Sequence, residues 1–374
     1  MDHLLWISTT SSSWGAYFEQ TADIDASDTS GWNIGAGFSP IGGGGTDQKF
    51  DGVYDGGGHV ISNLTINRPN TVNVGLFGHI GESGSGDGVE IKNLVLTNVD
   101  IKGARGTGSL VGRVTGDENT FITRCTASNG TVIGNGATGG LVGSNNSYVE
   151  TPSDRNHHPT IQYSYANVSV SWSTIGAGDK IGGLAGCNQK GKIYYSHARG
   201  SVTVDNSGEQ TEPTPQRVGG LAGCILIRGY IINSYSAGNV STAGTVNDVG
   251  GFVGSGGGGG SNGDTENCFW DTETSGQSSS SPGSGCTGKT TTQMQTQSTF
   301  TDTATEGLDE SWDFTNTWEM NEDVTYPLLQ GVEGQPPIPE WPVIALFSSG
   351  LLLIAGFIVV RRNNIRGLLQ RQAT

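Results

Sequence analysis

Two stretches of the chain repeat almost the same phrase: residues 181–187 read IGGLAGC, and residues 218–224 read VGGLAGC. Variants stand earlier, at 138–143 (TGGLVG), and later, at 249–254 (VGGFVG). None of the four stretches contains a charged side chain. A recurring small, apolar phrase of this kind is typical of a structural repeat and not of a catalytic motif.

One large apolar residue follows the glycines in every copy, and it recurs in two further copies that lack one of the two glycines. The spacings between successive members are 34, 31, 43, 37 and 31 residues. We expect these residues to point inward and to stack on one another in successive turns of a solenoid. The expected repeat core is Leu76, Leu110, Leu141, Leu184, Leu221 and Phe252.

A second short strand recurs between the copies of the phrase, while the connecting loops vary in length. A solenoid tolerates insertions in this way, because its turns keep register and its loops absorb the extra residues. We therefore predict an all-β right-handed parallel β-helix of roughly ten turns, about 4.8 Å apart. The glycines are expected to allow positive φ angles and close approach of neighbouring backbones. The second strand begins at Ile61, Ile91, Ile122, Ile161, Ile193 and Ile231.

Composition supports many short strands joined by turns. The 374 residues include 62 glycines, only 33% are hydrophobic and 14% are charged, and the net charge is −16. Gly, Ser, Thr and Asn, which favour turns, make up much of the remainder. A β-propeller is the alternative, but its blades need about four strands per repeat and only two or three are visible here. The acidity argues against a nucleic-acid partner.

The C-terminal region predicts a membrane anchor. Residues 342–360 run without a charge, and a helix of that length spans a bilayer core. Arginines in the tail 361–374 place that end in the cytoplasm, so the protein is expected at the cell surface as a single-pass protein. The alternative, a buried core helix, would need a polar face. The first 15 residues do not form a signal peptide, so we expect the natural start to lie upstream.

The repeat itself resembles a known family. The pattern GGL[VA]G followed by I-x-N-S-Y-[AS]-x-G-x-V is similar to the GLUG repeat of bacterial and archaeal surface proteins. Gly219–Gly223 and Ile231–Val240 carry the best match, and about residues 15–330 resemble the segments that surround such repeats. The resemblance implies an adhesin-like surface or secreted protein with an extracellular ligand, either a glycan or another surface protein.

The Pro-rich stretch before the apolar segment, together with that segment and its arginines, resembles C-terminal sorting signals of the PEP-CTERM type. This resemblance implies a membrane protease that cuts near the prolines, after which the protein is released or re-anchored. The alternative is a permanent single-span anchor. The expected organisation is: N-terminal entry turns 1–70, repeat β-helix 71–265, C-terminal capping segment 266–333, Pro-rich linker 334–341, transmembrane helix 342–360 and basic tail 361–374.

No catalytic or cofactor-binding residue is predicted. Acidic residues between 71 and 262 lie almost entirely in the variable loops and do not recur in the strand columns. The rival function, a polysaccharide lyase or hydrolase, requires clustered carboxylates, or Lys and Arg with a bound metal, on one face. We therefore predict a non-enzymatic binding or structural protein whose long loops, 144–160 and 204–217, and lateral face contact the ligand.

Three groups of residues stay open to two interpretations. Carboxylates at 23, 25 and 28 could hold a cation, although a solvated edge is favoured. The phrase places Cys187 and Cys224 in register, and Cys268 and Cys286 bracket a loop, so each pair is expected as a disulfide or as buried thiols. Tyrosines in the second column would either stack on sugar rings or line the core and its rim. They are Tyr163, Tyr165, Tyr195 and Tyr235.

Overall fold

A computed structural model of the protein describes residues 1–43, 48–82, 88–147, 158–172, 179–207, 216–256, 263–281 and 285–337. Residues 1–336 form one compact unit. The expected membrane helix 342–360 and the basic tail 361–374 lie outside the described residues. Among the described residues, no helix has both the length and the apolar character needed to cross a bilayer.

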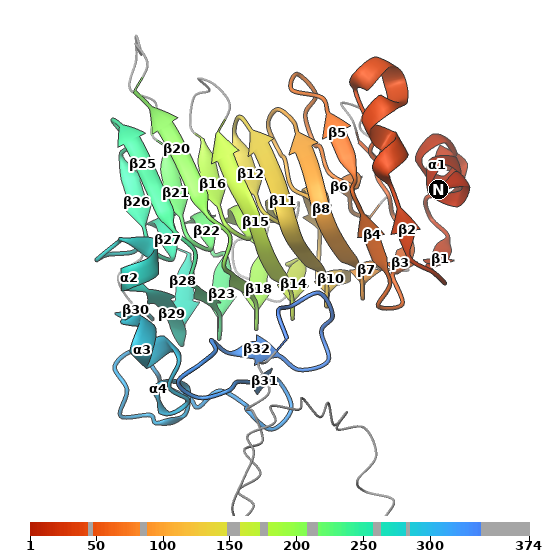
Figure 1. The fold of residues 1–374 in the computed structure, drawn as a ribbon. Helices are drawn as coiled ribbons and strands as arrows, with labels where there is room; N and C mark the ends of the chain where they lie inside the picture. Colours follow the sequence, from red (N-terminus) through yellow and green to blue (C-terminus); the bar gives the residue numbers. More distant parts are fainter. Residues whose placement is uncertain are drawn as a thin grey trace, which may run out of the picture. The chain divides into compact units, whose positions relative to one another are not determined.

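The described chain winds as a β-solenoid built from four parallel sheets, A to D (Figure 1). From β10 (Thr120–Thr123) onward, each full turn visits sheet A, then sheet B, then sheet D and then sheet C, whereas the turns that contain β6 (Phe77–Ile80) and β9 (Val111–Gly116) pass from sheet B to sheet C with no sheet D strand. The prediction of an all-β parallel solenoid is therefore confirmed. Sheet C contains six strands, so the stack has about six full turns and not the ten that we expected.

Sheets A and B contain the most strands, eight and twelve. Sheet A contains β1 (Tyr17–Glu19), β3 (Val53–Asp55), β7 (Val89–Lys92), β10 (Thr120–Thr123), β14 (Thr160–Gln162), β18 (Lys192–Tyr194), β23 (Tyr230–Ile232) and β28 (Asp264–Glu266). Sheet B contains β2 (Ile24–Asp25), β4 (Val60–Ser62), β5 (Thr65–Asn67), β8 (Val95–Lys102), β11 (Thr126–Gly134), β15 (Tyr165–Trp172), β19 (His197–Ala198), β20 (Val202–Asn206), β24 (Tyr235–Ser236), β25 (Val240–Gly244), β29 (Cys268–Asp271) and β30 (Cys286–Lys289).

Sheets D and C carry the repeated phrase, one on each side of its central bend. Sheet D contains β12 (Ala137–Gly139), β16 (Lys180–Gly182), β21 (Arg217–Gly219) and β26 (Asp248–Gly250). Sheet C contains β6 (Phe77–Ile80), β9 (Val111–Gly116), β13 (Val142–Ser147), β17 (Ala185–Gln189), β22 (Ala222–Leu226) and β27 (Val253–Gly256).

The six residues of the expected repeat core lie at the bend between sheets D and C. All six side chains are completely buried. Backbone hydrogen bonds connect the series from turn to turn, for example from the amide of Leu141 to the carbonyl of Leu184 and from Leu184 to Leu221. The apolar side chains therefore form a continuous column inside the coil.

The glycines of the phrase leave room for backbone and not for side chains. A Cβ atom at Gly186 would lie 2.3 Å from the backbone nitrogen of Thr138, and one at Gly223 would lie 2.3 Å from that of Ile181. The backbones of adjacent turns are therefore in direct contact at this corner. The expected positive φ angles are absent from the glycines of both GGLAG copies, so close approach is the reason for these residues.

Positive φ angles occur instead at the bend between sheets A and B. One residue per turn is left-handed there, with φ between 45° and 54°. These residues are Asn93, Arg124, Tyr163, Tyr195, Asn233 and Asn267. Asparagine tolerates this conformation better than most residues, which explains the N of the N-S-Y pattern.

The serine of the same pattern closes the bend. The hydroxyl groups of Ser164, Ser196 and Ser234 each donate to the carbonyl two residues earlier. Each hydroxyl of Ser196 and Ser234 also accepts the amide of its equivalent in the preceding turn, at 3.2 Å. Cys125 and Cys268 occupy the same position at the two ends of this ladder. The serine therefore satisfies buried backbone groups in the three turns that carry it.

The alignment of the second strand column is wrong at its first member. Ile61 lies on β4 in sheet B and pairs with Leu96 of β8. Tyr54 on β3 is the true neighbour of Ile91 in sheet A. The later members pair in sheet A as expected, from Ile91 to Ile122 and onward. The segment around Ile61 has an I-x-N pattern because a second left-handed position, Asn63, follows its strand.

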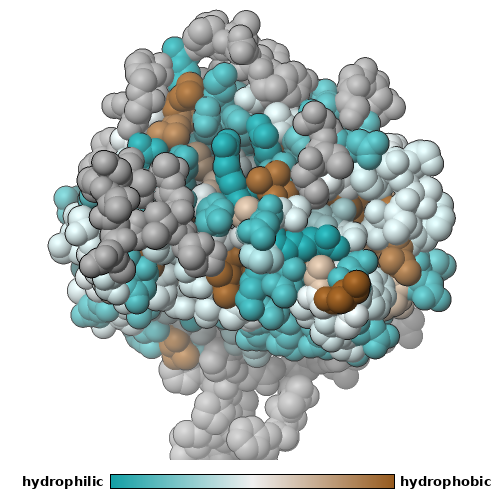
Figure 2. Space-filling model, turned by 90° about the horizontal axis from the view of Figure 1, so that it is seen from above, coloured by the Kyte–Doolittle hydropathy of each residue, from teal (hydrophilic) through white to brown (hydrophobic). Residues whose placement is uncertain are grey.

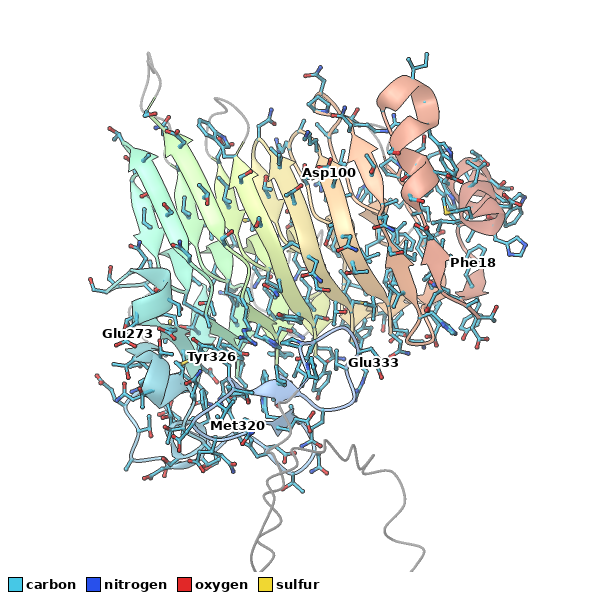
Figure 3. All side chains as sticks on the ribbon, viewed as in Figure 1. Phe18, Asp100, Glu273, Met320, Tyr326 and Glu333 are labelled. Atoms are coloured by element: carbon cyan, nitrogen blue, oxygen red, sulfur yellow. The ribbon has the colours of Figure 1, made fainter. Side chains whose placement is uncertain are left out.

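Two irregular parts complete the unit. At the N-terminus, helix α1 (Asp2–Thr9) and 3₁₀ helices η1 (Ser11–Ser13) and η2 (Ser27–Gly35) precede the regular turns, and Leu4, Ile7 and Trp14 join the main core. After β30, residues 290–336 run back along the coil beside the lower ends of the strands; we call them the return segment (Figures 1 and 3). Helix α2 (Thr272–Ser275) follows β29, and the return segment contains α3 (Thr291–Met294), α4 (Ser298–Thr301), β31 (Trp318–Glu319) and β32 (Leu328–Leu329).

Candidate functional site

A groove lies between the strands of sheet D and those of sheet C, and we call it the C–D groove. Its volume is about 440 Å³. Residues from the loops before β6, β9 and β12 close one side of it. The lining residues are Val72, Asn73, Arg105, Gly106, Arg113, Gly136, Ala137, Ser144, Asn146, Lys180, Cys187 and Gln189.

The parallel register aligns the groove's side chains in rows along the coil axis. In sheet C, Arg113 on β9 stands beside Ser144 on β13, which stands beside Cys187 on β17. In sheet D, Lys180 on β16 stands beside Arg217 on β21. Successive members of a row are one strand spacing apart, about 4.8 Å. The groove therefore presents a regular ladder of side chains.

The groove is basic although the protein is acidic. Arg105, Arg113 and Lys180 line it, and no carboxylate stands among its described lining residues. The whole chain, in contrast, carries a net charge of −16. Local charge and not net charge decides which ligand a cleft attracts, because the low-dielectric walls of a cleft focus its field.

Two titratable groups near the groove respond to its cations. Burial, together with the positive charges of Arg113 and Lys49, lowers the pKa of His79 to about 4. A hydrogen bond from Cys224 lowers the pKa of Cys187, and Lys180 and Arg217 act in the same direction. Positive charge thus acts on both ends of this face.

Hydrogen-bonding groups accompany the cations. The groove is lined by the side-chain amides of Asn73, Asn146 and Gln189 and by the hydroxyl of Ser144. The carbonyl oxygen of Asn146 is buried and has no hydrogen-bond partner among the described residues. Amides and hydroxyls beside cations form a surface that suits a hydroxylated, negatively charged ligand.

Both expected cysteine pairs lie in register on adjacent strands. Cys187 on β17 faces Cys224 on β22, with their sulfur atoms 2.6 Å apart. Cys268 on β29 faces Cys286 on β30. All five cysteines are buried free thiols in the structure, and burial raises the pKa of Cys125 and Cys268 to about 12. Disulfide formation in either pair stays a prediction.

The tyrosines of the second column lie in the core and at its rim. Tyr165 and Tyr235 are fully buried and stack on the two faces of His197, with ring centroids 4.4 and 4.7 Å away. Tyr163 and Tyr195 are half-buried, stack on each other at 5.1 Å and pack against the aromatic cluster of the return segment. This packing favours the core-and-rim interpretation over an open sugar-stacking row.

The acidic residues near the N-terminus act as local hydrogen-bond acceptors. Asp23 accepts the amide of Val60, and Asp25 accepts the side-chain amide of Asn63; these bonds lower the pKa of both carboxyl groups. Among the residues described, no group of three or more His, Cys, Asp or Glu side chains is placed to hold a metal ion. The expected ligand-contacting loops lie largely outside the described residues, at 148–157 and 208–215.

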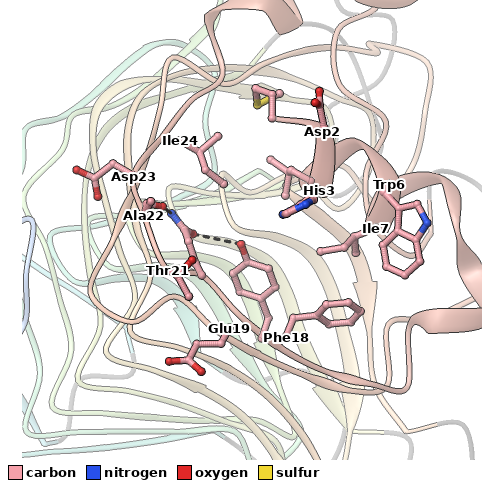
Figure 4. Close-up of a pocket in the computed structure, with 14 residues that line it drawn as sticks. Asp2, His3, Trp6, Ile7, Phe18, Glu19, Thr21, Ala22, Asp23 and Ile24 are labelled. Atoms are coloured by element: carbon pink, nitrogen blue, oxygen red, sulfur yellow. Dashed lines mark hydrogen bonds between the residues drawn. The ribbon is translucent and has the colours of Figure 1, made fainter.

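A second cavity, of about 550 Å³, lies between α1 and the first strands (Figure 4). Asp23 and Trp6 stand on opposite sides of it, and Tyr54 donates a hydrogen bond to Gln20 inside it. Its charged lining residues Asp2, Glu19 and Asp23 are spread around the rim and form no cluster. This pocket therefore offers less chemistry than the C–D groove.

The surface seen from above is mainly hydrophilic (Figure 2). Hydrophobic residues appear there as separate small spots and not as one patch. Large apolar patches mark protein or membrane contact surfaces, so this face offers polar contacts instead.

Sequence reasoning missed the C–D groove, although a signal for it is present. The residue two positions before the double glycine is Lys180 in one copy of the phrase and Arg217 in the next. These cations recur with the phrase, and recurrence at a fixed position means alignment in a parallel stack. Only the fold shows that Arg113 of sheet C lines the same groove as Lys180.

Comparison with known proteins places the fold and leaves the family open. No family model matches the chain. A crystal structure from Bacteroides ovatus, provisionally named an immunoglobulin A1 protease, superimposes with a TM-score of 0.56 at 24% identity, covering 84% of this chain and 85% of that one. At this identity the likeness concerns the fold alone.

Two sequence relatives are more similar locally. Halomucin from Haloquadratum walsbyi is 43% identical over 129 residues, which are 34% of this chain and 1% of that protein. A protein of Evansella cellulosilytica, provisionally named a Gly-rich membrane protein, is 30% identical over 391 residues, covering 84% of this chain and 42% of that one. The chain thus spans less than half the length of either relative.

Proposed function

We propose that this protein is a cell-surface β-solenoid that binds an extracellular ligand and does not catalyse a reaction. The observation that carries the proposal is the C–D groove, whose described lining offers cations, amides and a hydroxyl but no carboxylate. Acid–base cleavage of a glycosidic bond ordinarily needs two carboxyl groups flanking that bond. A groove of this composition suits recognition, and the rigid stacked turns keep its side chains in fixed positions.

The surface location rests on three supports. The uncharged segment 342–360 followed by arginines has the length and flanks of a membrane anchor. One relative is named for a membrane, and the repeat resembles that of adhesin-like GLUG surface proteins. A sorting protease acting near the Pro-rich linker 334–341 is part of the proposal.

Fractionation of cells tests the location. The full chain is expected to sediment with membranes, and a chain truncated after residue 336 is expected to be soluble or secreted. Intact-mass measurement of the cell-derived protein then separates a retained anchor from a processed one. Equal sedimentation of both chains would refute the anchor.

Turnover assays test the binding proposal. The purified chain is incubated with acidic and neutral polysaccharides, and product length is followed by size-exclusion chromatography. We expect retention of ligand without shortening. Cleavage that disappears when one carboxylate is changed to its amide would favour the second candidate, a carbohydrate-active β-helix enzyme, whose support is the solenoid fold itself.

A further inference from the structure

We propose that the C–D groove binds a linear acidic saccharide along the coil axis, with Arg105, Arg113 and Lys180 contacting its carboxylate or sulfate groups. This inference rests on the proposed binding function and adds the chemical class of the ligand and the residues that select it.

The cations come from different turns of the coil. Arg105 and Arg113 flank the bend that leads into β9, whereas Lys180 stands on β16, two turns further along. Two strand spacings correspond to roughly 10 Å along the axis. A chain with an anionic group on successive units can contact cations that stand on different turns of the coil.

Arginine and lysine are suited to binding carboxylate and sulfate groups. Guanidinium and ammonium donors form charge-assisted hydrogen bonds with carboxylates and sulfates, and arginine binds two oxygens at once. Arg217, beside Lys180 in the next turn, forms a 3.7 Å ion pair with Asp248.

Other side chains favour a saccharide over other polyanions. The amides of Asn73, Asn146 and Gln189 and the hydroxyl of Ser144 can donate to and accept from sugar hydroxyls. No aromatic ring stands among the described lining residues, so nucleobases would find nothing to stack on. Only Val72, Ala137 and the cysteine are apolar, so an acidic peptide would find few anchors.

The cavity has a size that fits one short part of such a chain. Its volume of about 440 Å³ lies within the range of small-ligand sites, roughly 300–1,000 Å³. A longer polymer would extend beyond the groove at both ends.

The test uses the full chain in mild detergent and polymers that differ only in charge. Dextran and dextran sulfate form a matched pair, and polygalacturonate supplies carboxylates in place of sulfates. Binding is measured by biolayer interferometry at low and high salt. We expect binding of dextran sulfate or polygalacturonate, no binding of dextran, and weakening as salt screens the contacts.

Matched variants locate the binding. Lys180→Gln and Arg113→Gln are each expected to weaken binding about tenfold, because one charge-assisted contact is lost. Lys92→Gln removes a cation of sheet A, which is paired with Glu90 outside the groove, and is expected to change affinity less than twofold. Thermal melts of all variants check that they fold alike.

Each outcome separates this inference from the proposed function. Equal effects of Lys180→Gln and Lys92→Gln, equal binding of dextran, or tighter binding of poly-glutamate or single-stranded DNA would overturn the acidic-saccharide groove. Shortening of polygalacturonate in the same samples would overturn the non-enzymatic function while leaving the groove as its binding site. If Arg113→Gln unfolds the protein, Lys180→Gln alone decides.

Discussion

The glycines of the repeated phrase are needed because a side chain at these positions would clash with neighbouring backbone. In sheet D, a Cβ atom at Gly182 would lie 2.2 Å from the carbonyl oxygen of Ala185 and 2.7 Å from the Cα of Ala222. Both neighbours are backbone of this turn and the next, so neither can rotate away. The phrase recurs because every turn must make the same tight corner.

Gly182→Ala is therefore expected to destabilise the protein by about 1–3 kcal/mol, the usual cost of overpacking. The free energy of unfolding is measured by urea denaturation. Gly31→Ala is the matched control, because a Cβ there meets no atom within 4 Å. Equal stability of the two variants would show that the corner is looser than the structure indicates.

The cysteine pairs can be tested at the same scale. Register places Cys187 beside Cys224 and Cys268 beside Cys286 at a strand spacing that a disulfide bridges. For protein purified without reductant, we predict two disulfides and one free thiol, at Cys125. Thiol counting and intact mass, before and after reduction in denaturant, check this. Five free thiols in both samples would reject both bonds.

The return segment is the least regular element and holds the bend between sheets A and B. Tyr235 donates to the carbonyl of Pro327 at 2.6 Å, and the indole of Trp312 donates to the carbonyl of Asn267 at 3.1 Å. Arg124 donates to carbonyl groups near residue 330. The segment thus connects the last turns of the coil to earlier ones, far away in sequence.

Trp318 is the buried centre of that contact. We expect Trp318→Ala to cost about 3–5 kcal/mol and to release the return segment. Limited proteolysis followed by mass spectrometry would then show faster cleavage within residues 302–336. The control is Trp6→Ala, whose side chain is 51% exposed. Unchanged cleavage in the Trp318 variant would mean that the segment is held elsewhere.

The buried His197 makes the free energy of unfolding depend on pH. Burial lowers its pKa well below 6.5, with Arg199 acting in the same direction, so the folded protein keeps it neutral. The unfolded chain takes up a proton as the pH falls below about 6.5, and the folded protein does not. The contribution of this histidine to stability is therefore complete above pH 6.5. As the pH falls below 6.5, the free energy of unfolding decreases by up to about 1.4 kcal/mol per pH unit for each such histidine.

His197→Phe is expected to reduce this slope between pH 6.5 and 5, measured by urea denaturation at each pH. Some slope remains, because the pKa of His79 is also lowered, to about 4. The exposed His3 provides the control variant, His3→Phe, which is expected to leave the slope unchanged. A slope unaffected by His197→Phe would contradict the buried neutral histidine.

At the scale of the whole molecule, the sequence predicts what repeats and misses what does not. The columns through Leu184 and Ile193 follow from recurrence alone, since residues at equal positions in a parallel stack must lie side by side. The first strand was misassigned, because an I-x-N pattern fits two different bends. The return segment and the C–D groove depend on contacts between segments distant in sequence, which no periodicity reveals.

The central claim is that successive copies of the repeat are parallel neighbours in one continuous coil. Exposed residues on β20 and β25 test it directly, because Thr203 pairs with Ser241 and lies two positions out of register with Ala243. Under mild oxidation, T203C/S241C is predicted to form a disulfide, since the Cα atoms are about 5 Å apart. T203C/A243C is predicted not to form one. Efficient bonding in the second variant and none in the first would contradict the account.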